Sequence, residues 1–271
     1  LALICALMAI PLATANSEQT NVTVAVNNQP PVVYFVSVTD QSPTEGTTTA
    51  VVFEVRVSDP NGISDIDSVN ATFTKAGETT RTDGSCIFDQ QLSAVTANYT
   101  CTINMLYYDA AGVWTVNAYA NDTNGASDVN STETFTYGSL SAMTMNPNAI
   151  NFGTLTPGAT DQGATDDPVV LNNTGNQNFT DVNVTAIDLI GLVDTTKYIP
   201  AENFSVNVAD AANGDLMSNN TAVTITSAAL YRLWNIYTGT EDLYFYLEEV
   251  PNVPAQTYSA TGARKWTVEV S

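Results

Sequence analysis

Residues 109–125 read Asp109-Ala110-Ala111-Gly112-Val113-Trp114-Thr115-Val116-Asn117-Ala118-Tyr119-Ala120-Asn121-Asp122-Thr123-Asn124-Gly125, one strand between two turns. Gly112 and small polar residues supply the first turn. Along the strand apolar residues alternate with polar ones, and the apolar set is Trp114, Val116, Ala118 and Ala120. This alternation predicts one buried face and one wet face. A strand of this kind needs a second sheet to cover its apolar side.

The same alternation recurs on both sides of this strand, between segments rich in turn residues. It is present at 32–38, 51–57, 69–73, near Ile87, at 99–105 and at 129–137. Seven short strands without a helical period predict an all-β, antiparallel, immunoglobulin-like β-sandwich over 30–138. Residues 16–29 are polar apart from the alternating Val22, Val24 and Val26, and we expect a linker or an edge strand there.

A second, tandem β-sandwich is predicted over 149–271. It follows a hinge at 139–148, which lacks alternation and contains Pro147. Strands are expected from Ala149 into the Pro157-Gly158 turn, after Pro168, and at the end of the chain through Trp266, Val268 and Val270. Residues 210–226 fit no strand order.

Two parts of the chain resemble known modules. The 109–125 run, with Trp114-Thr115-Val116 at its centre, resembles the penultimate strand and flanking turns of immunoglobulin-like and PKD-like modules of secreted surface proteins. The Asn151-Phe152-Gly153 segment and the 169–176 segment that follows it are similar to β-sandwich modules of archaeal and bacterial envelope proteins. The resemblance implies a fold and a cell-surface setting, but no particular ligand.

The first fifteen residues carry no charge and end in Ala13-Thr14-Ala15, which predicts a signal peptide over 1–15. A retained membrane anchor or a pilin-type helix is the alternative, although each needs about 20 apolar residues and the polar Asn16-Ser17 ends this run. No apolar helix is predicted at the C-terminal end. We therefore expect an extracellular, cell-surface protein whose mature chain has no transmembrane anchor and is retained by contacts or glycans.

The charge of the chain restricts its partners. The sequence has 7 Lys+Arg against 28 Asp+Glu, a formal net charge of −21, although only 13% of its residues are charged. Nucleic acids and anionic membranes bind through Lys and Arg, so neither is an expected partner. Cations, basic proteins, other envelope proteins, further copies of this chain and glycans remain. Halophilic adaptation is an alternative explanation of the negative net charge, but we expect a halophilic protein to carry a higher density of carboxylates than this chain.

Once the signal peptide with Cys5 is removed, two cysteines are left. Cys86 and Cys101 flank a turn-like 90–94 segment in an exported β-rich chain, which predicts a disulfide that ties a hairpin. The alternative is a catalytic or metal-binding thiol. Such a thiol has no His available as a base or co-ligand, because the sequence contains none.

The residue inventory argues against an enzyme. Without His or a free thiol, Ser-His, Cys-His and His-metal sites are excluded. A carboxylate pair is the remaining device, but Asp166-Asp167 and Glu248-Glu249 are sequence neighbours that point to opposite faces or lie in loops. No aspartic-protease triplet is present. We predict a protein without catalytic residues.

Aromatic residues of the second domain offer a binding surface. In 243–247 two tyrosines alternate with Leu243, Phe245 and Leu247. If the three apolar residues face the core, Tyr244 and Tyr246 are exposed and available to sugar or protein ligands. The alternative, which we favour, is that the sheet is covered on both sides or that the tyrosines pack on the first domain.

Asn-X-Ser/Thr glycosylation motifs are the most numerous motif in the chain. At Asn98, Asn178, Asn183 and Asn203 the middle residue is apolar, so alternation predicts that the acceptor lies on the wet face of a strand. The full set is Asn21, Asn70, Asn98, Asn121, Asn130, Asn172, Asn178, Asn183, Asn203 and Asn219.

A structural Ca²⁺ is the one cofactor that the sequence predicts. In an immunoglobulin-like topology the loops at 59–67 and 121–128 emerge at the same end of the sandwich. Carboxylates with neighbouring Asn oxygens suit this cation, and the alternative is ordinary Asx-turn chemistry without a metal. The aspartates that would crowd this pole are Asp59, Asp65, Asp67, Asp122 and Asp128.

These observations predict a secreted, N-glycosylated cell-envelope protein of a prokaryote, archaeal rather than bacterial, with a structural or adhesive role. The alternative function is an extracellular glycan- or protein-binding module that uses the exposed aromatics of its second domain.

Overall fold

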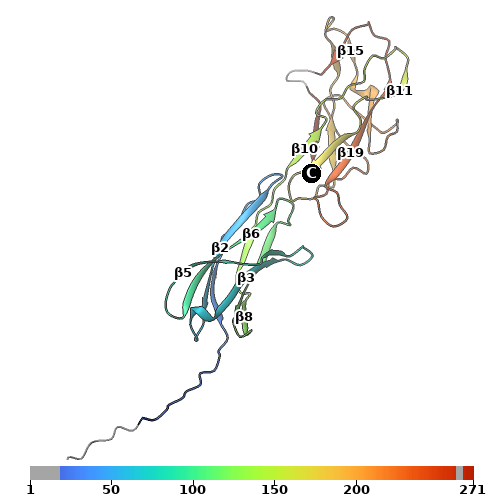
Figure 1. Cartoon of the computed structure of the whole chain (residues 1–271). Coiled ribbons are helices and arrows are strands. Elements are labelled where there is room, and N and C mark those ends of the chain that lie inside the picture. Colours follow the sequence, from blue (N-terminus) through green and yellow to red (C-terminus); the bar gives the residue numbers. More distant parts are fainter. Residues whose placement is uncertain (1–18, 261–264) are drawn as a thin grey trace, which may run out of the picture.

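The structure, a computed structural model, describes residues 19–260 and 265–271 (Figure 1). The described chain is nearly all-β, with antiparallel sheets and two short 3-10 turns, η1 (Ile63–Asp65) and η2 (Ala201–Asn203). Within these ranges no helix is both long and apolar enough to cross a membrane. The predicted signal peptide, 1–15, and Cys5 lie outside the described residues.

Residues 31–137, which we call the N-terminal half, form two sheets. One has the order β1-β2-β6-β5, and the other has the order β4-β3-β7-β8, with β9 also pairing with β7. Their strands are β1 (Val32–Ser37), β2 (Thr48–Ser58), β3 (Ile66–Thr74), β4 (Arg81–Asp83), β5 (Ile87–Gln91), β6 (Thr96–Leu106), β7 (Gly112–Asp122), β8 (Ser127–Asn130) and β9 (Thr134–Tyr137).

The core of the N-terminal half contains the predicted apolar face of β7. Trp114, Val116, Ala118 and Ala120 are all fully buried. The indole Nε1 of Trp114 donates a hydrogen bond to the carbonyl oxygen of Ala110, 2.9 Å away, so the ring is buried without an unsatisfied donor. Inward residues of both sheets complete one core cluster.

Three predictions for this half need correction. The expected strand at 129–137 is divided into β8 and β9, because the side-chain oxygen of Asn130 accepts hydrogen bonds from the backbone and hydroxyl of Thr132 and turns the chain. Gln90 and Gln91 belong to strand β5 rather than to a turn. Strand β4 has no alternating apolar residues and was not predicted.

Residues 143–271, the C-terminal half, form three sheets around a second core cluster. The first has the order β10-β12-β19-β16-β17, with β11 also on β19; the others are β18-β13-β21 and β15-β14-β20. The strands are β10 (Met143–Asn146), β11 (Thr160–Gly163), β12 (Val169–Asn173), β13 (Val182–Thr185), β14 (Leu189–Gly191), β15 (Tyr198–Ile199), β16 (Phe204–Asn207), β17 (Asp215–Leu216), β18 (Ala222–Thr224), β19 (Thr240–Glu249), β20 (Tyr258–Ser259) and β21 (Thr267–Val270).

The predicted hinge at 139–148 is wrong in part, since it contains β10. Met143 and Met145 pack against the second core, and β10 pairs with β12. The strand expected after Ala149 is absent from the described structure, although Ile150, Phe152 and Leu155 pack on the same core from a loop. Residues 210–226 provide the short strands β17 and β18, which pair with β16 and β13.

Candidate metal centre and the junction between the halves

Three of the five predicted aspartates meet at the end of the N-terminal half where β2 and β7 finish. Asp59 follows β2, Asp65 lies in η1 just before β3, and Asp122 is the last residue of β7. One carboxylate oxygen from each lies within 4.8 Å of the others. We call this cluster the acidic pole.

Asp59 is the buried member of the acidic pole. The residue is 0% exposed. Its Oδ1 accepts a hydrogen bond from the backbone N–H of Asn61 at 2.7 Å, whereas its Oδ2 is buried with no hydrogen-bond donor among the described residues. A buried carboxylate oxygen requires a hydrogen-bond donor or a cation, because moving it out of water without such a partner costs several kcal/mol. The orphaned oxygen therefore fits a cation ligand.

Asp122 and Asp65 are held by donors from the following turn. The backbone N–H groups of Asn124 and Ala126 donate to Asp122 Oδ1 at 2.9 and 2.8 Å. A hydrogen bond from the side chain of Asn28 to Asp122 is the main cause that lowers the pKa of this carboxyl below its ordinary value. The Thr123 hydroxyl donates to Asp65. Ionised oxygens at this spacing suit Ca²⁺ better than a soft metal.

The linker before β1 is fastened to the same pole, which sequence reasoning missed. Asn28 Nδ2 donates to Asp122 Oδ2 at 2.7 Å, and the backbone N–H of Gln29 donates to Asn61 Oδ1 at 2.8 Å. Asn124 Nδ2 donates to Asn28 Oδ1 at 3.1 Å. The Asn27-Asn28-Gln29 run before Pro30-Pro31 was the available signal, since amide side chains satisfy turn backbones.

The other two predicted aspartates are placed elsewhere. Asp67 lies exposed on β3, and Asp128 Oδ2 accepts a hydrogen bond from the backbone N–H of Val33 at 2.8 Å. Asp128 therefore fastens β8 to β1. Neither belongs to the group of carboxylates that lie within reach of one ion.

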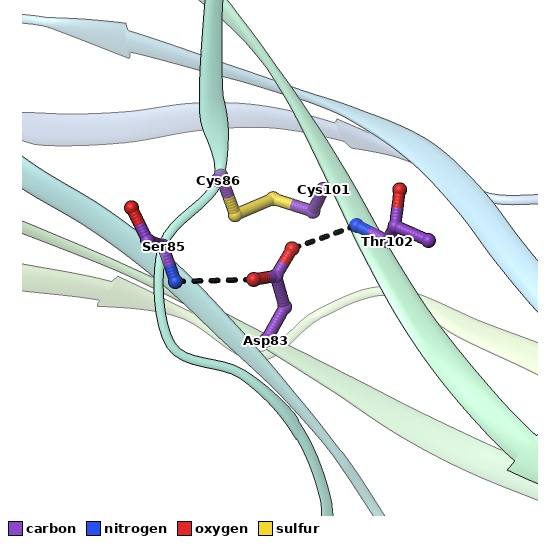
Figure 2. The surroundings of a disulfide bond; sticks show 5 residues. All are labelled: Asp83, Ser85, Cys86, Cys101 and Thr102. Carbon is purple, nitrogen blue, oxygen red and sulfur yellow. Dashed lines mark hydrogen bonds between the residues drawn. A yellow bond between two sulfur atoms is a disulfide. The ribbon is translucent and has the colours of Figure 1, made fainter.

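Cys86 and Cys101 form a disulfide that joins the start of β5 to β6 (Figure 2). Beside it, Asp83 accepts hydrogen bonds from the backbone N–H of Ser85 at 3.0 Å and from that of Thr102 at 2.7 Å. Figure 2 shows this carboxylate alongside the two sulfurs. Because the sulfurs are bonded to each other, they are not thiolate ligands, and the group serves to hold β4 and β5 against β6.

Reduction of the disulfide is expected to destabilise the protein by about 3 kcal/mol, because the bond closes a loop whose ends are 15 residues apart. Intact-mass analysis after alkylation measures the thiols, and denaturant unfolding with and without reductant measures the stability. Two alkylatable thiols in the unreduced native protein would contradict the assignment.

The two halves are joined by an ion pair between Arg232 and Glu78. The guanidinium Nη2 lies 2.6 Å from Glu78 Oε1, and Nη1 donates to the carbonyl oxygen of Tyr108 at 2.6 Å. The side chains of Arg232 and Glu78 are 11% and 7% exposed. The Arg232 guanidinium also lies 5.2 Å from the centre of the Trp234 ring. These contacts bring together the loop before β19 and the β3–β4 and β6–β7 loops.

Buried amides and a hydroxyl add to this junction. Asn176 is 4% exposed, and its Nδ2 donates to the carbonyl oxygens of Asp109 and Gly138 at 3.1 and 2.9 Å. The Thr174 hydroxyl donates to Glu45 Oε1 at 2.6 Å. Since each donor meets an acceptor from the other half or from the connecting segment, the junction fixes one relative orientation.

The glycosylation motifs differ in their access to solvent. Asn21, Asn178 and Asn219 are exposed, whereas most of the others are half-buried. Asn98 is a correction: it is 5% exposed, and its side chain donates a hydrogen bond to Asp89 of β5, the neighbouring strand in the same sheet. Asn203 is also corrected, since it lies in η2 rather than on a strand face.

The alternation predicted for β19 is correct, but its tyrosines are half-buried. Leu243, Phe245 and Leu247 lie in the second core. Tyr246 pairs with Gly163 of β11, and its hydroxyl donates to Asp210 Oδ1 at 2.5 Å. This hydrogen bond is the main cause that raises the pKa of Tyr246 to about 12. Tyr246 is therefore engaged within the fold.

Asp167 lies close to this tyrosine and is partly buried. Its Oδ2 accepts the backbone N–H of Phe245 at 2.8 Å, while Oδ1 is buried without a donor among the described residues. The pKa of Asp167 is raised to about 6, mainly by burial and in part by the nearby Asp210 and Asp166 carboxylates.

This raised pKa predicts how stability depends on pH. The folded state binds the Asp167 proton more tightly than the unfolded state, so its contribution is complete below about pH 4 and is lost as pH rises through about 6. The Asp167→Asn variant is expected to be more stable than the parent at pH 8 and to lack this pH step. Urea titrations from pH 4 to 8 measure it, with Asp67→Asn, an exposed position in the other half, as control.

Comparison with known proteins gives little guidance. No protein-family model and no curated protein matches the chain. A solved structure of a DUF4466 family protein from Parabacteroides merdae is similar over 82% of this chain and 98% of that chain, at 11% identity and a TM-score of 0.20.

Proposed function

We propose that the chain consists of two tandem β-sandwich domains, the first immunoglobulin-like, and serves as a structural or adhesive component of a prokaryotic cell surface, archaeal rather than bacterial. The junction between the halves carries this proposal. A buried ion pair and satisfied amides hold one orientation, which suits a spacer that keeps a fixed distance. The disulfide adds support, because structural disulfides persist in oxidising compartments.

The acidic pole gives this component a dependence on calcium. Asp59, Asp65 and Asp122 would hold the ion, and extracellular modules bind Ca²⁺ with dissociation constants of about 10⁻⁴ to 10⁻³ M. The ion would neutralise crowded carboxylates and satisfy the buried oxygen of Asp59. Glycans on Asn21, Asn178 and Asn219, the most accessible acceptors, would cover part of the surface.

Protease treatment of intact cells tests the location. Proteinase K added outside the cells should remove the protein and leave a cytoplasmic marker intact. Recovery of the protein from the cytosol, with Cys86 and Cys101 reduced, would contradict the proposal.

A glycan- or protein-binding module is the second candidate. Tyr231 and Tyr237 stack with ring centres 4.5 Å apart beside a cavity of ≈ 270 Å³. That volume lies below the usual range of about 300–1,000 Å³ for ligand pockets, so these tyrosines would bind a ligand at the surface rather than enclose it. Saturable binding on a glycan array that is lost in Tyr237→Ala would favour the binding function instead.

A further inference from the structure

The segment before the first strand is exposed and apolar along one side. Residues 19–30 are exposed throughout and form no strand. Val22, Val24 and Val26 are 83%, 78% and 82% exposed. In an extended chain these alternate side chains lie on one face. Figure 1 shows this dark blue segment leading away from the N-terminal half, at the end opposite the C-terminal half.

The C-terminal half has an open groove between two sheet edges. Strand β10 ends one sheet and β21 ends the three-stranded sheet β18-β13-β21. Between them lies a groove of ≈ 670 Å³, lined by Met143, Phe179 and Val270 among others. Figure 1 shows the C-terminal end of β21, marked C, near β10. The lining is mixed: Met143, Phe179 and Val270 are apolar, although Phe179 is only 6% exposed, and most of the other residues are polar, including the carboxylate of Glu269. On either side of the groove, β10 and β21 have outer edges without a partner strand in the described structure.

The valines cannot enter the groove of their own chain. Asn28 fastens the segment at the acidic pole, and Val22 lies only six residues before it, a reach of about 20 Å. The eleven-residue β2 runs from the junction to that pole, and it alone spans about 35 Å. A second copy of the chain must therefore supply the strand.

Charge favours this segment as the point of contact between copies. The chain has a formal net charge of −21, so two copies repel each other. Residues 19–30 carry no charge and can approach another copy without adding to that repulsion.

We propose that residues 20–26 of one copy add as a fourth strand beside β21 of the next, with Val22, Val24 and Val26 covering the groove. Backbone hydrogen bonds to the free edge would supply affinity, and the alternate valines would fix the register. Because the segment and the groove belong to different halves, repetition gives a head-to-tail assembly, which is a filament where the rotation between copies does not close a ring. This assembly rests on the structural role proposed above and specifies how copies join.

Paired charge substitutions test the contact. The purified protein, produced without glycans, should form concentration-dependent oligomers in light scattering. In V24D/V26D two carboxylates enter the apolar face, and association should weaken at least about 30-fold, since buried charge is costly. T23D/A25D adds the same charge on the opposite face and should stay within about threefold of the parent. These side chains are exposed or lie outside any strand, so the fold is preserved.

A cross-linking experiment locates the contact. Val24→Cys in one preparation and Met143→Cys in another should form a mixed disulfide, and Thr23→Cys in place of Val24→Cys should not. A monomer at about 100 μM, equal association of the two charge variants, or absence of the Val24–Met143 cross-link would overturn the proposal. A monomeric protein that is nevertheless found on the cell surface would leave the proposed function standing and remove this mode of assembly.

Discussion

The Glu78→Gln variant is expected to lose about 3–5 kcal/mol of unfolding free energy, because it leaves the Arg232 guanidinium buried without its counter-charge. Chemical denaturation followed by tryptophan fluorescence measures the loss, and Trp234, 5.2 Å from that guanidinium, reports on the site itself. If the halves separate so that Arg232 reaches water, small-angle scattering should show a larger radius of gyration.

Two further variants define what the pair contributes. Glu78→Leu with Arg232→Met removes both charges, so we expect stability near that of the parent or above it. Glu54→Gln breaks the ion pair between Glu54 and Arg56, whose side chains are 33% and 37% exposed, respectively. Because this pair lies in contact with solvent, its loss should cost no more than about 1 kcal/mol of unfolding free energy. Equal losses of unfolding free energy in Glu78→Gln and Glu54→Gln would mean that the Arg232–Glu78 pair does not behave as a buried ion pair.

Calcium is expected to raise the stability of the protein by about 1.5–3 kcal/mol at ~10 mM, through mass action on a site with a dissociation constant of about 10⁻⁴ to 10⁻³ M. For a chain of this size the midpoint of thermal unfolding should rise by about 3–12 °C. Magnesium should raise it less, since it gives up its water shell reluctantly. Thermal scans in calcium, magnesium and chelator measure these shifts.

Substitution of Asp59 distinguishes a calcium site from an ordinary Asx turn without a metal. In chelator, Asp59→Asn is expected to be at least as stable as the parent, because one of three crowded carboxylates is neutral. In calcium, Asp59→Asn should not show the rise in stability that calcium gives the parent. Asp67→Asn makes the same charge change outside the cluster and should keep the full response. An unchanged calcium response in Asp59→Asn would rule out this site and leave an Asx turn.

The N-terminal half could be predicted from sequence because its strands are long and one-sided. Strands β2 and β7 have eleven residues each, and the alternation runs through 51–57 and 114–120, long enough to show which face is buried. Asn98 shows where this reasoning stops. It was predicted to lie on the wet face, but it is 5% exposed and bonds Asp89 of the neighbouring strand β5, and alternation within one strand carries no information about a neighbour.

The C-terminal half was harder because many of its strands are short. A two-residue strand such as β15 or β17 exists through its partner, not through its own pattern. Strand β10 was mistaken for a hinge, because its alternation of Met143 and Met145 with polar residues is only four residues long and does not stand out from the surrounding segment. Tertiary packing decides such segments, and one sequence does not reveal it.

The acidic pole was predictable in part for a related reason. Topology brings the loop after β2 and the loop after β7 to one end, and that was enough to place Asp59, Asp65 and Asp122 together. It was not enough to separate them from Asp67 and Asp128, because strand phase and a hydrogen bond to Val33 decide where those carboxylates go. The contact from Asn28 spans 94 positions, and the Asn27-Asn28-Gln29 run indicates amide side chains able to bond a turn but not the distant partner Asp122.

The disulfide also limits how far the molecule can be stretched. A pull on residue 19 and on Ser271 would unravel the N-terminal half from both ends, but the segment from Cys86 to Cys101, 15 residues, stays a closed ring. At about 3.3–3.6 Å per extended residue, roughly 50 Å of contour length is withheld while the bond is intact. Single-molecule pulling before and after reduction would read this length directly, as the difference between two contour increments.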